Sequence, residues 1–298
     1  MKTIEPHFSI IIPTFNRAQL LLSSVKSILK QDNASFEIVI VDDGGDDNTA
    51  QVIKELNDVR VHYIKTENRE RGAARNSGLM LAQGVYVNYF DSDDIYNSCL
   101  SELYQFILKN NSPNVIYGLI ENITDKGSSI EIHEPRYPTL KKNLLHNNFM
   151  ACGSVFVKRE IAVNYLFSED RRLSGTEDWE LWLRLYADFD FIKFPMVIFK
   201  QRNHSSRSLA DVSAARVTER ETVFIDHIHH HHQSLSARFS KSELDLFVAD
   251  RNTLIALANC VSGSKKQAVE YLKRASGTSL WVLTRKRFWA VLKKLIID

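Results

Sequence analysis

Short apolar runs alternate with segments of helical periodicity over the first ninety residues of the chain. Ser9–Ile12 is mainly apolar and ends at Pro13, which is typical of a buried strand. Apolar residues then recur every three or four positions from Leu20 to Leu29, which predicts a helix. The alternation continues with strands at Phe36–Val41, Arg60–Ile64 and Val85–Phe90, and helices at Asp47–Leu56 and Ala73–Ala82. Strands separated by helices of this length form parallel βαβ units.

The pattern becomes mixed after residue 110. Val115–Asn122 and Ser129–His133 predict a hairpin across a turn that contains Gly127. There follow a strand at Ser154–Val157, a helix at Thr176–Ala187 with Thr176 as N-cap, and one or two strands at Phe191–Lys200 broken at Pro195. Only helical signals occur from about residue 214 onwards. The sequence therefore predicts an α/β body with a mostly parallel central sheet at residues 1–210 and a helical C-terminal region at residues 211–298.

Composition restricts the class of protein. Hydrophobic residues make up 44% of the chain and charged residues 25%, which is typical of a soluble globular protein. A net charge of only +2 argues against a dedicated nucleic-acid binder. The three widely spaced cysteines indicate a reducing compartment. Because neither a signal-peptide pattern nor an apolar run of about 18 residues is found, we expect a cytoplasmic location.

The positive charge is concentrated near the C-terminus. Residues 261–298 contain nine basic and two acidic side chains. On a helical wheel of Leu280–Ile297, most of the apolar residues, including Trp281, Phe288 and Trp289, share one arc, and most of the basic residues lie opposite. This pattern suits a basic amphipathic helix on an anionic membrane surface, which would make the protein peripheral on the inner face of the membrane. A helix packed on the body, or at a dimer contact, has the same pattern.

Two acidic clusters directly follow predicted strands. Asp42 and Asp43 end the second strand, and Asp91–Asp94 follows the strand at Val85–Phe90. Ligands of parallel sheets bind beyond the carboxyl ends of the strands. Carboxylates two residues apart in a turn are suitable ligands for Mg²⁺ or Mn²⁺, which prefer oxygen. A solvated turn or a helix cap would explain the same residues.

Six motifs occur in a characteristic order: Ser9–Arg17 (SIIIPTFNR), Glu37–Gly44 (EIVIVDDG), Gly72–Gly78 (GAARNSG), Asp91–Asp94 (DSDD), Glu177–Trp182 (EDWELW) and Arg202–Ser206 (RNHSS). Together they resemble the family 2 glycosyltransferases, which have the GT-A type nucleotide-binding fold. The resemblance covers residues 8–208. It implies an inverting, metal-dependent enzyme that moves a sugar from a nucleoside-diphosphate donor, with UDP as the expected nucleotide, to a hydroxyl group of a glycan acceptor in surface polysaccharide or lipid-linked glycan synthesis.

The resemblance also implies roles for single residues. The donor-binding residues are Pro13, Phe15, Asp42, Asp43, Arg75, Asn76 and Asp91, of which Pro13, Phe15 and Asp43 contact the nucleotide base. Arg75 either faces the diphosphate or is a surface charge on its helix. Asp93 and His204 are the implied ligands of Mn²⁺ or Mg²⁺, although a lone histidine is often structural.

Asp178 is the implied general base, which takes the proton of the acceptor hydroxyl. An acidic residue at a helix N-terminus is also explained by the helix dipole alone.

Several observations leave room for other functions. A nucleotidyltransferase would share the nucleotide-binding body, but it needs a glycine-rich basic loop where this chain has Pro13–Arg17. A non-catalytic glycan- or nucleotide-binding protein of the same fold would not need Asp93 and Asp178. The dense histidines between His227 and His232 are compatible with metal binding, but a solvated helix or loop is the simpler interpretation.

Overall fold

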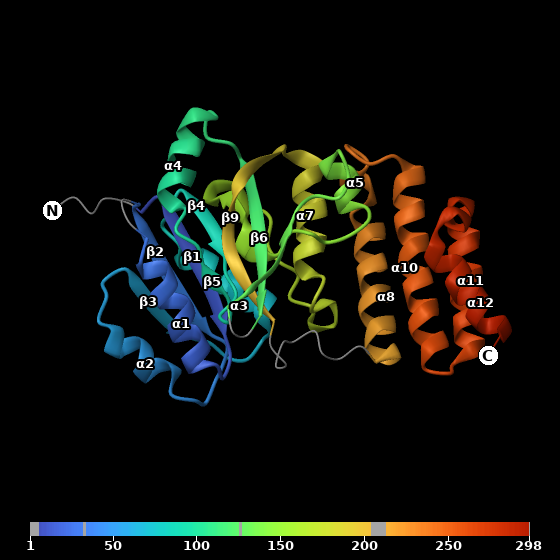
Figure 1. Cartoon of the computed structure of the whole chain (residues 1–298), viewed down its shortest axis with the longest axis horizontal. Coiled ribbons are helices and arrows are strands. Elements are labelled where there is room, and N and C mark those ends of the chain that lie inside the picture. The colour runs from blue at the N-terminus through green and yellow to red at the C-terminus, as the bar shows by residue number, and fades with distance from the viewer. Residues whose placement is uncertain (1–5, 32–33, 125–126, 204–212, 298) are drawn as a thin grey trace. The chain divides into compact units, whose positions relative to one another are not determined.

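The computed structural model describes residues 6–31, 34–124, 127–203 and 213–297, which form two compact units (Figure 1). The first unit is drawn from Met1–Arg136, Phe149–Arg171 and Phe189–His204. The second is drawn from Tyr137–Asn148, Arg172–Asp188 and Ser205–Asp298. The helical C-terminal residues thus share a unit with two segments from the first 210 residues.

The first unit contains a mixed sheet, nine-stranded over the described residues, with the order β3-β2-β1-β4-β8-β6-β9-β5 and with β7 paired to β6. The strands are β1 (Phe8–Thr14), β2 (Phe36–Asp42), β3 (Val61–Lys65), β4 (Tyr86–Tyr89), β5 (Ile95–Tyr96), β6 (Val115–Thr124), β7 (Ser129–His133), β8 (Val155–Lys158) and β9 (Phe191–Asn203). The first four are parallel to one another, as predicted. The other half of the sheet is mixed, because β8 is antiparallel to both β4 and β6 while β9 is parallel to β6.

Helices cover both faces of the parallel half. They are α1 (Ala18–Leu29), α2 (Thr49–Leu56), α3 (Arg71–Leu81) and α4 (Leu100–Lys109), and a short α6 (Arg159–Ala162) follows β8. Ile10 and Ile12 share a buried core cluster with the apolar sides of α1 and α4. Ile11 points to the opposite face, since alternate side chains of a strand do so. There α3 approaches so closely that a Cβ on Gly78 would lie 2.4 Å from Ile11 Cγ2.

The long strand β9 corrects one prediction. A break at Pro195 was expected, yet the strand runs from Phe191 to Asn203 without interruption. The register with β6 shifts instead, from Tyr117 opposite Lys193 to Leu119 opposite Val197. Proline lacks the N–H of a sheet ladder and is therefore found at such irregularities. Pairing on both sides of Pro195 keeps the strand continuous, and the predicted hairpin of β6 and β7 is confirmed.

The second unit consists of helices: α5 (Leu140–Leu144), α7 (Glu177–Asp188), α8 (Ala214–His230), α9 (His232–Leu235), α10 (Lys241–Val261), α11 (Lys265–Thr278) and α12 (Lys286–Ile297). In Figure 1, α10 lies between α8 and the pair α11 and α12, and it contacts all three. A buried cluster of small and apolar side chains from α10, α11 and α12 holds these helices together.

The segment Leu280–Ile297 is not the single helix assumed for the helical wheel. A 3-10 helix ends at Thr284, and Arg285 is extended (φ −89°, ψ 129°) before α12 begins. Phe288 and Val291 are buried in the cluster with α10 and α11. Part of the predicted apolar arc is therefore buried in this cluster, while Trp281 and Trp289 are exposed to solvent. Among the described residues, no helix is long and apolar enough to cross a membrane.

Candidate functional site

Three neighbouring strands of the first unit end at the same edge of the sheet. In the parallel register, Thr14 of β1 lies opposite Asp42 of β2, and Ile11 of β1 lies opposite Tyr89 of β4. The segments that follow these strands carry Phe15, the Asp42–Asp43 pair and Asp91–Asp94. The structure therefore brings the two predicted acidic clusters to one edge, where parallel sheets bind ligands.

The Asp42 carboxylate is buried and hydrogen-bonded on both oxygens. Its Oδ1 accepts from the backbone N–H of Gly45 at 2.8 Å, and its Oδ2 accepts from the hydroxyl of Tyr63 at 2.7 Å. Burial, followed by the hydrogen bond to Asp42, raises the pKa of Tyr63, so the phenol keeps its proton and donates. Asp42 thus fixes the turn after β2.

The neighbouring carboxylate of Asp43 fixes the approach to α3. Its Oδ1 and Oδ2 accept from the backbone N–H groups of Arg69 and Glu70, both at 2.8 Å. Burial raises the pKa of Asp43, and these two donors oppose the rise only in part. Both Asp42 and Asp43 therefore act as caps of backbone N–H groups, as the alternative interpretation of this acidic pair expects. Each carboxylate oxygen has a second lone pair, which leaves acceptor capacity for a ligand.

The predicted base-pocket residues on β1 differ in exposure. Pro13 is buried within β1, whereas the Phe15 side chain is 47% exposed just beyond it. A large exposed aromatic ring at the ligand edge of a sheet is a suitable surface for stacking a planar group.

Arg75 is not a surface charge, and that alternative is wrong. The side chain is 2% exposed, its Nη2 donates to Asp91 Oδ1 at 2.9 Å, and its Cζ lies 5.1 Å from the centre of the Phe167 ring. Burial of a guanidinium requires a partner. The position of Arg75 on α3 therefore serves to hold the more exposed carboxylate of Asp91.

Asn76 links α3 to the segment Phe149–Arg171 of the same unit. Its Nδ2 donates to the carbonyl oxygen of Phe167 at 3.0 Å, and its Oδ1 accepts from the N–H of the same residue at 3.0 Å. This pair of bonds places Phe167 over Arg75. In the structure Asn76 acts as a positioning residue for that ring.

Asp93 receives a hydrogen bond from a residue to which no role was assigned. Arg17 Nη1 donates to Asp93 Oδ2 at 2.7 Å, and the Asp93 side chain is 14% exposed. Arg17 ends the first of the six motifs, so the motif itself was the signal. The adjacent Asp94 is buried and accepts from the backbone N–H of Arg202 at 3.0 Å, which ties this acidic turn to β9.

The acidic turn has the chemistry of a divalent-cation site. Asp91 and Asp93 supply carboxylate oxygens from one turn, and both are at least partly exposed. Mg²⁺ and Mn²⁺ prefer such ligands. Arg75 and Arg17 already contact these carboxylates, so a bound cation would share them with two guanidinium groups. His204, the other predicted ligand, lies outside the described residues.

Asp178 belongs to the second unit, in the first turn of α7. Its Oδ1 accepts from Asn148 Nδ2 at 2.9 Å, and the side chain is half-buried. The next residue, Trp179, is buried, and its Nε1 donates to the carbonyl oxygen of Leu144 at 2.8 Å. Trp179 also packs against Phe224, which anchors this end of α7. Asn148 was missed from the sequence because nothing in its neighbourhood resembles a motif.

Comparisons with known proteins identify the family and the fold of this chain. The sequence model of glycosyl transferase family 2 matches residues 9–166, which include both acidic clusters and α3. The UDP-Glc:alpha-D-GlcNAc-diphosphoundecaprenol beta-1,3-glucosyltransferase WfgD of Escherichia coli is 30% identical over 181 residues, covering 60% of this chain and 70% of that protein.

A second relative is the GalNAc(5)-diNAcBac-PP-undecaprenol beta-1,3-glucosyltransferase of Campylobacter jejuni. It is 33% identical over 196 residues, and the match covers 62% of each chain, so this chain spans less than two thirds of that relative. Among solved structures, TarS of S. aureus (residues 1–349) in complex with UDP-GlcNAc superposes with a TM-score of 0.69 at 18% identity. The match covers 97% of this chain and 88% of TarS. This likeness confirms the predicted fold, an α/β body followed by helices.

Proposed function

Because the chain belongs to glycosyl transferase family 2 and is a glycosyltransferase related to enzymes named for undecaprenol-linked acceptors, we propose that it transfers a sugar from a UDP-sugar to a hydroxyl group of a lipid-linked glycan. The observation that carries the proposal is the meeting of both acidic clusters and buried Arg75 at one edge of the sheet. The choice of UDP is supported by the UDP-GlcNAc complex of TarS and by the donor in the name of WfgD. Membership of the family excludes the nucleotidyltransferase alternative.

The donor is assigned to the first unit. Exposed Phe15 would stack on the nucleotide base, with Pro13 beneath it and Asp43 accepting a hydrogen bond from the base. Asp93 and Asp91 would hold Mn²⁺ or Mg²⁺, which supplies positive charge against the leaving diphosphate when bound. Arg75 keeps Asp91 oriented through the 2.9 Å bond, and Arg17 does the same for Asp93 at 2.7 Å. His204 stays a predicted ligand.

The general base is assigned to Asp178. Asn148 holds Oδ1 of this carboxylate, so its orientation is set before the acceptor binds. The carboxylate takes the proton of the acceptor hydroxyl as the hydroxyl oxygen bonds to the anomeric carbon. The bond from that carbon to the diphosphate oxygen breaks on the opposite face, so the configuration at the anomeric carbon inverts.

The base assignment is tested by Asp178→Asn, with Asp188→Asn as the matched control. Both residues lie on α7, and Asp188 is an exposed residue at the other end of the helix. We expect Asp178→Asn to lower turnover roughly 10²–10⁴-fold with unchanged UDP binding, because the amide keeps the size but not the basicity. The control should turn over like the wild type. Near wild-type turnover of Asp178→Asn would show that this residue only stabilises the helix terminus. If the wild type itself does not hydrolyse the donor, a non-catalytic binding protein is favoured.

Attachment to an anionic membrane is the second part of the proposal. Trp281 is 66% exposed and Trp289 54% exposed, and the basic residues Lys286 and Lys293 are exposed as well. Aromatic and basic side chains exposed together suit the interface of a membrane that contains anionic lipids. A lipid-linked acceptor would lie at that same surface. The protein would then act as a peripheral enzyme of the inner membrane face.

A further inference from the structure

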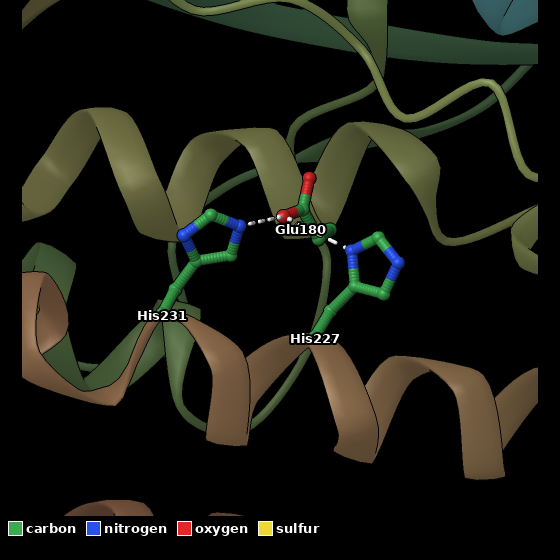
Figure 2. A group of neighbouring side chains, drawn as sticks. All are labelled: Glu180, His227 and His231. Atoms are coloured by element: carbon green, nitrogen blue, oxygen red, sulfur yellow. Dashed lines mark hydrogen bonds and ion pairs between the residues drawn. The ribbon is translucent and has the colours of Figure 1, made fainter.

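Two of the clustered histidines at the C-terminal end of α8 lie opposite an acid of α7. His227 is in the last turn of α8, and His231, four residues later, is the C-cap of that helix. Figure 2 shows both rings directed at Glu180. His227 Nδ1 lies 3.5 Å from Glu180 Oε1, and His231 Nε2 lies 3.7 Å from the same oxygen. All three residues belong to the second unit.

We propose that Glu180, His227 and His231 bind a divalent transition-metal ion of the zinc class. One ligand atom from each residue lies within 4.8 Å of the other two. Zinc bonds of about 2.0–2.2 Å in tetrahedral geometry place two ligand atoms roughly 3.3–3.6 Å apart. The two N···O distances are close to this spacing, and the two nitrogens, which lie within 4.8 Å of each other, would move closer together around a bound ion. Two histidines and one glutamate are a known ligand set for zinc with one position left open.

The surroundings of the cluster provide the support that such a site needs. Glu180 is 2% exposed, and Arg184 donates to both of its carboxylate oxygens at 2.7 and 2.8 Å, which fixes their direction.

The charge of Arg184 also determines which ions the site favours. A carboxylate shared with a guanidinium attracts a cation less strongly, so the two imidazoles supply most of the binding. Imidazole suits zinc, nickel and copper, whereas manganese and magnesium prefer oxygen ligands. We therefore expect zinc to bind and manganese not to bind, which separates this cluster from the acidic turn of the first unit.

A bound ion would crosslink α7 to the C-terminal end of α8. The rings of His227 and His231 are partly exposed, so an ion reaches them from solvent. His229 is exposed on the same helix and supplies no ligand atom, whereas the ring of His230 packs edge-on against that of His231, with ring centres 4.8 Å apart. An ion held by residues of both helices stabilises the second unit, since it binds the folded state only.

The test titrates the full chain, free of added histidines, with zinc alone against a chromophoric chelator, and repeats the titration with manganese. The wild type should bind one equivalent of zinc and show a raised Tm. His227→Gln with His231→Gln should weaken binding at least ~100-fold, because loss of only a supporting partner already costs 10–100-fold. The matched control, His229→Gln, should bind like the wild type.

Three results would overturn the proposal. They are equal losses in the ligand double variant and in the control, absence of a zinc-dependent rise in Tm, and manganese binding as tight as that of zinc. Circular dichroism without metal checks the fold of each variant. If the ligand double variant does not fold, His231→Gln alone supplies the comparison, with an expected loss of about tenfold or more. None of these readouts depends on sugar transfer, so the proposed function stands or falls separately.

Discussion

The same glycine-to-alanine substitution should have opposite effects on stability at two helical positions. At Gly78 in α3, an added Cβ would lie 2.4 Å from Ile11 Cγ2 and 3.1 Å from Val41 Cγ2. Ordinary contact begins at 3.4 Å, so Ile11 or the helix must move by about 1 Å. At Gly277 in α11, nothing lies within 4 Å of the added atom. Gly277 is therefore the matched control.

The magnitudes follow from the two environments. Overpacking costs about 1–3 kcal/mol, from which the helix preference of alanine recovers roughly 0.4–1 kcal/mol. We expect Gly78→Ala to lower the free energy of unfolding by about 1–2 kcal/mol, or roughly 2–8 °C in Tm for a unit of this size. Gly277→Ala should raise stability by up to about 1 kcal/mol. Differential scanning calorimetry measures both. An unchanged or higher Tm for Gly78→Ala would refute the close packing of α3 on β1.

Three further variants test the acidic turn Asp91–Asp94, the helix cap Asp47 and the exposed tryptophans of the C-terminal tail, residues 279–298. Asp93→Ala should abolish the manganese-dependent part of UDP binding in calorimetry. Asp46→Ala, on the exposed turn after β2, is the control and should keep the manganese-dependent part. If manganese still strengthens UDP binding in Asp93→Ala, Asp93 is not the metal ligand. Asp47 accepts from backbone N–H groups at the starts of α1 and α2, and Asp47→Ala should cost about 0.5–1 kcal/mol at neutral pH. Burial raises the pKa of Asp47, but its hydrogen bonds outweigh burial and lower the pKa below 3.8. The stability difference between variant and wild type should therefore be constant above pH 3.8 and shrink as the pH falls further and the carboxylate is protonated. A stability difference that grows in acid would contradict the lowered pKa. Replacing Trp281 and Trp289 by serine should weaken sedimentation with anionic vesicles at least tenfold, since burial of one large apolar side chain contributes about 1.5–3 kcal/mol; sedimentation equal to that of the wild type would contradict membrane attachment.

Point substitutions are the right test of the tail, because deleting residues 279–298 would also remove part of the core. Val282, Phe288 and Val291 are buried against α10 and α11. A truncated chain would expose that cluster, and weaker vesicle binding would then have two explanations. Val59→Ser, at an apolar residue that is 92% exposed in the first unit, serves as the control and should sediment like the wild type.

The strands and helices of the parallel half were predictable because each depends on local periodicity. β1 and β2 are buried on both faces, so apart from Ser9 and Glu37, which hydrogen-bond to each other, they are apolar up to their last residue and need no tertiary information. Their acidic ends follow at once, which is why both clusters could be located. The break expected at Pro195 is wrong for the opposite reason: pairing with β6 decides the course of β9, and the strand's own sequence does not contain that partner.

Side-chain environments were less predictable than elements. Arg75 has the pattern of either a surface or a ligand-facing residue, and its burial involves a contact with Phe167, which lies far along the chain. From the sequence, His227 and His231 were only members of a dense histidine cluster that was compatible with metal binding. Their partner Glu180 could not be identified, because the packing of α7 on α8 is a tertiary contact. Motif order therefore indicated the family, while the supporting contacts required the structure.

The central claim is that this chain transfers a sugar from a UDP-sugar with inversion at the anomeric carbon. The most direct measurement incubates the protein and Mn²⁺ with a panel of α-linked UDP-sugars and an undecaprenol-linked glycan acceptor, and determines the configuration of the new linkage by NMR. The account predicts a β-linked product from one α-linked donor, formed only when the acceptor is present. An α-linked product, or release of UDP with no sugar on the acceptor, would contradict it.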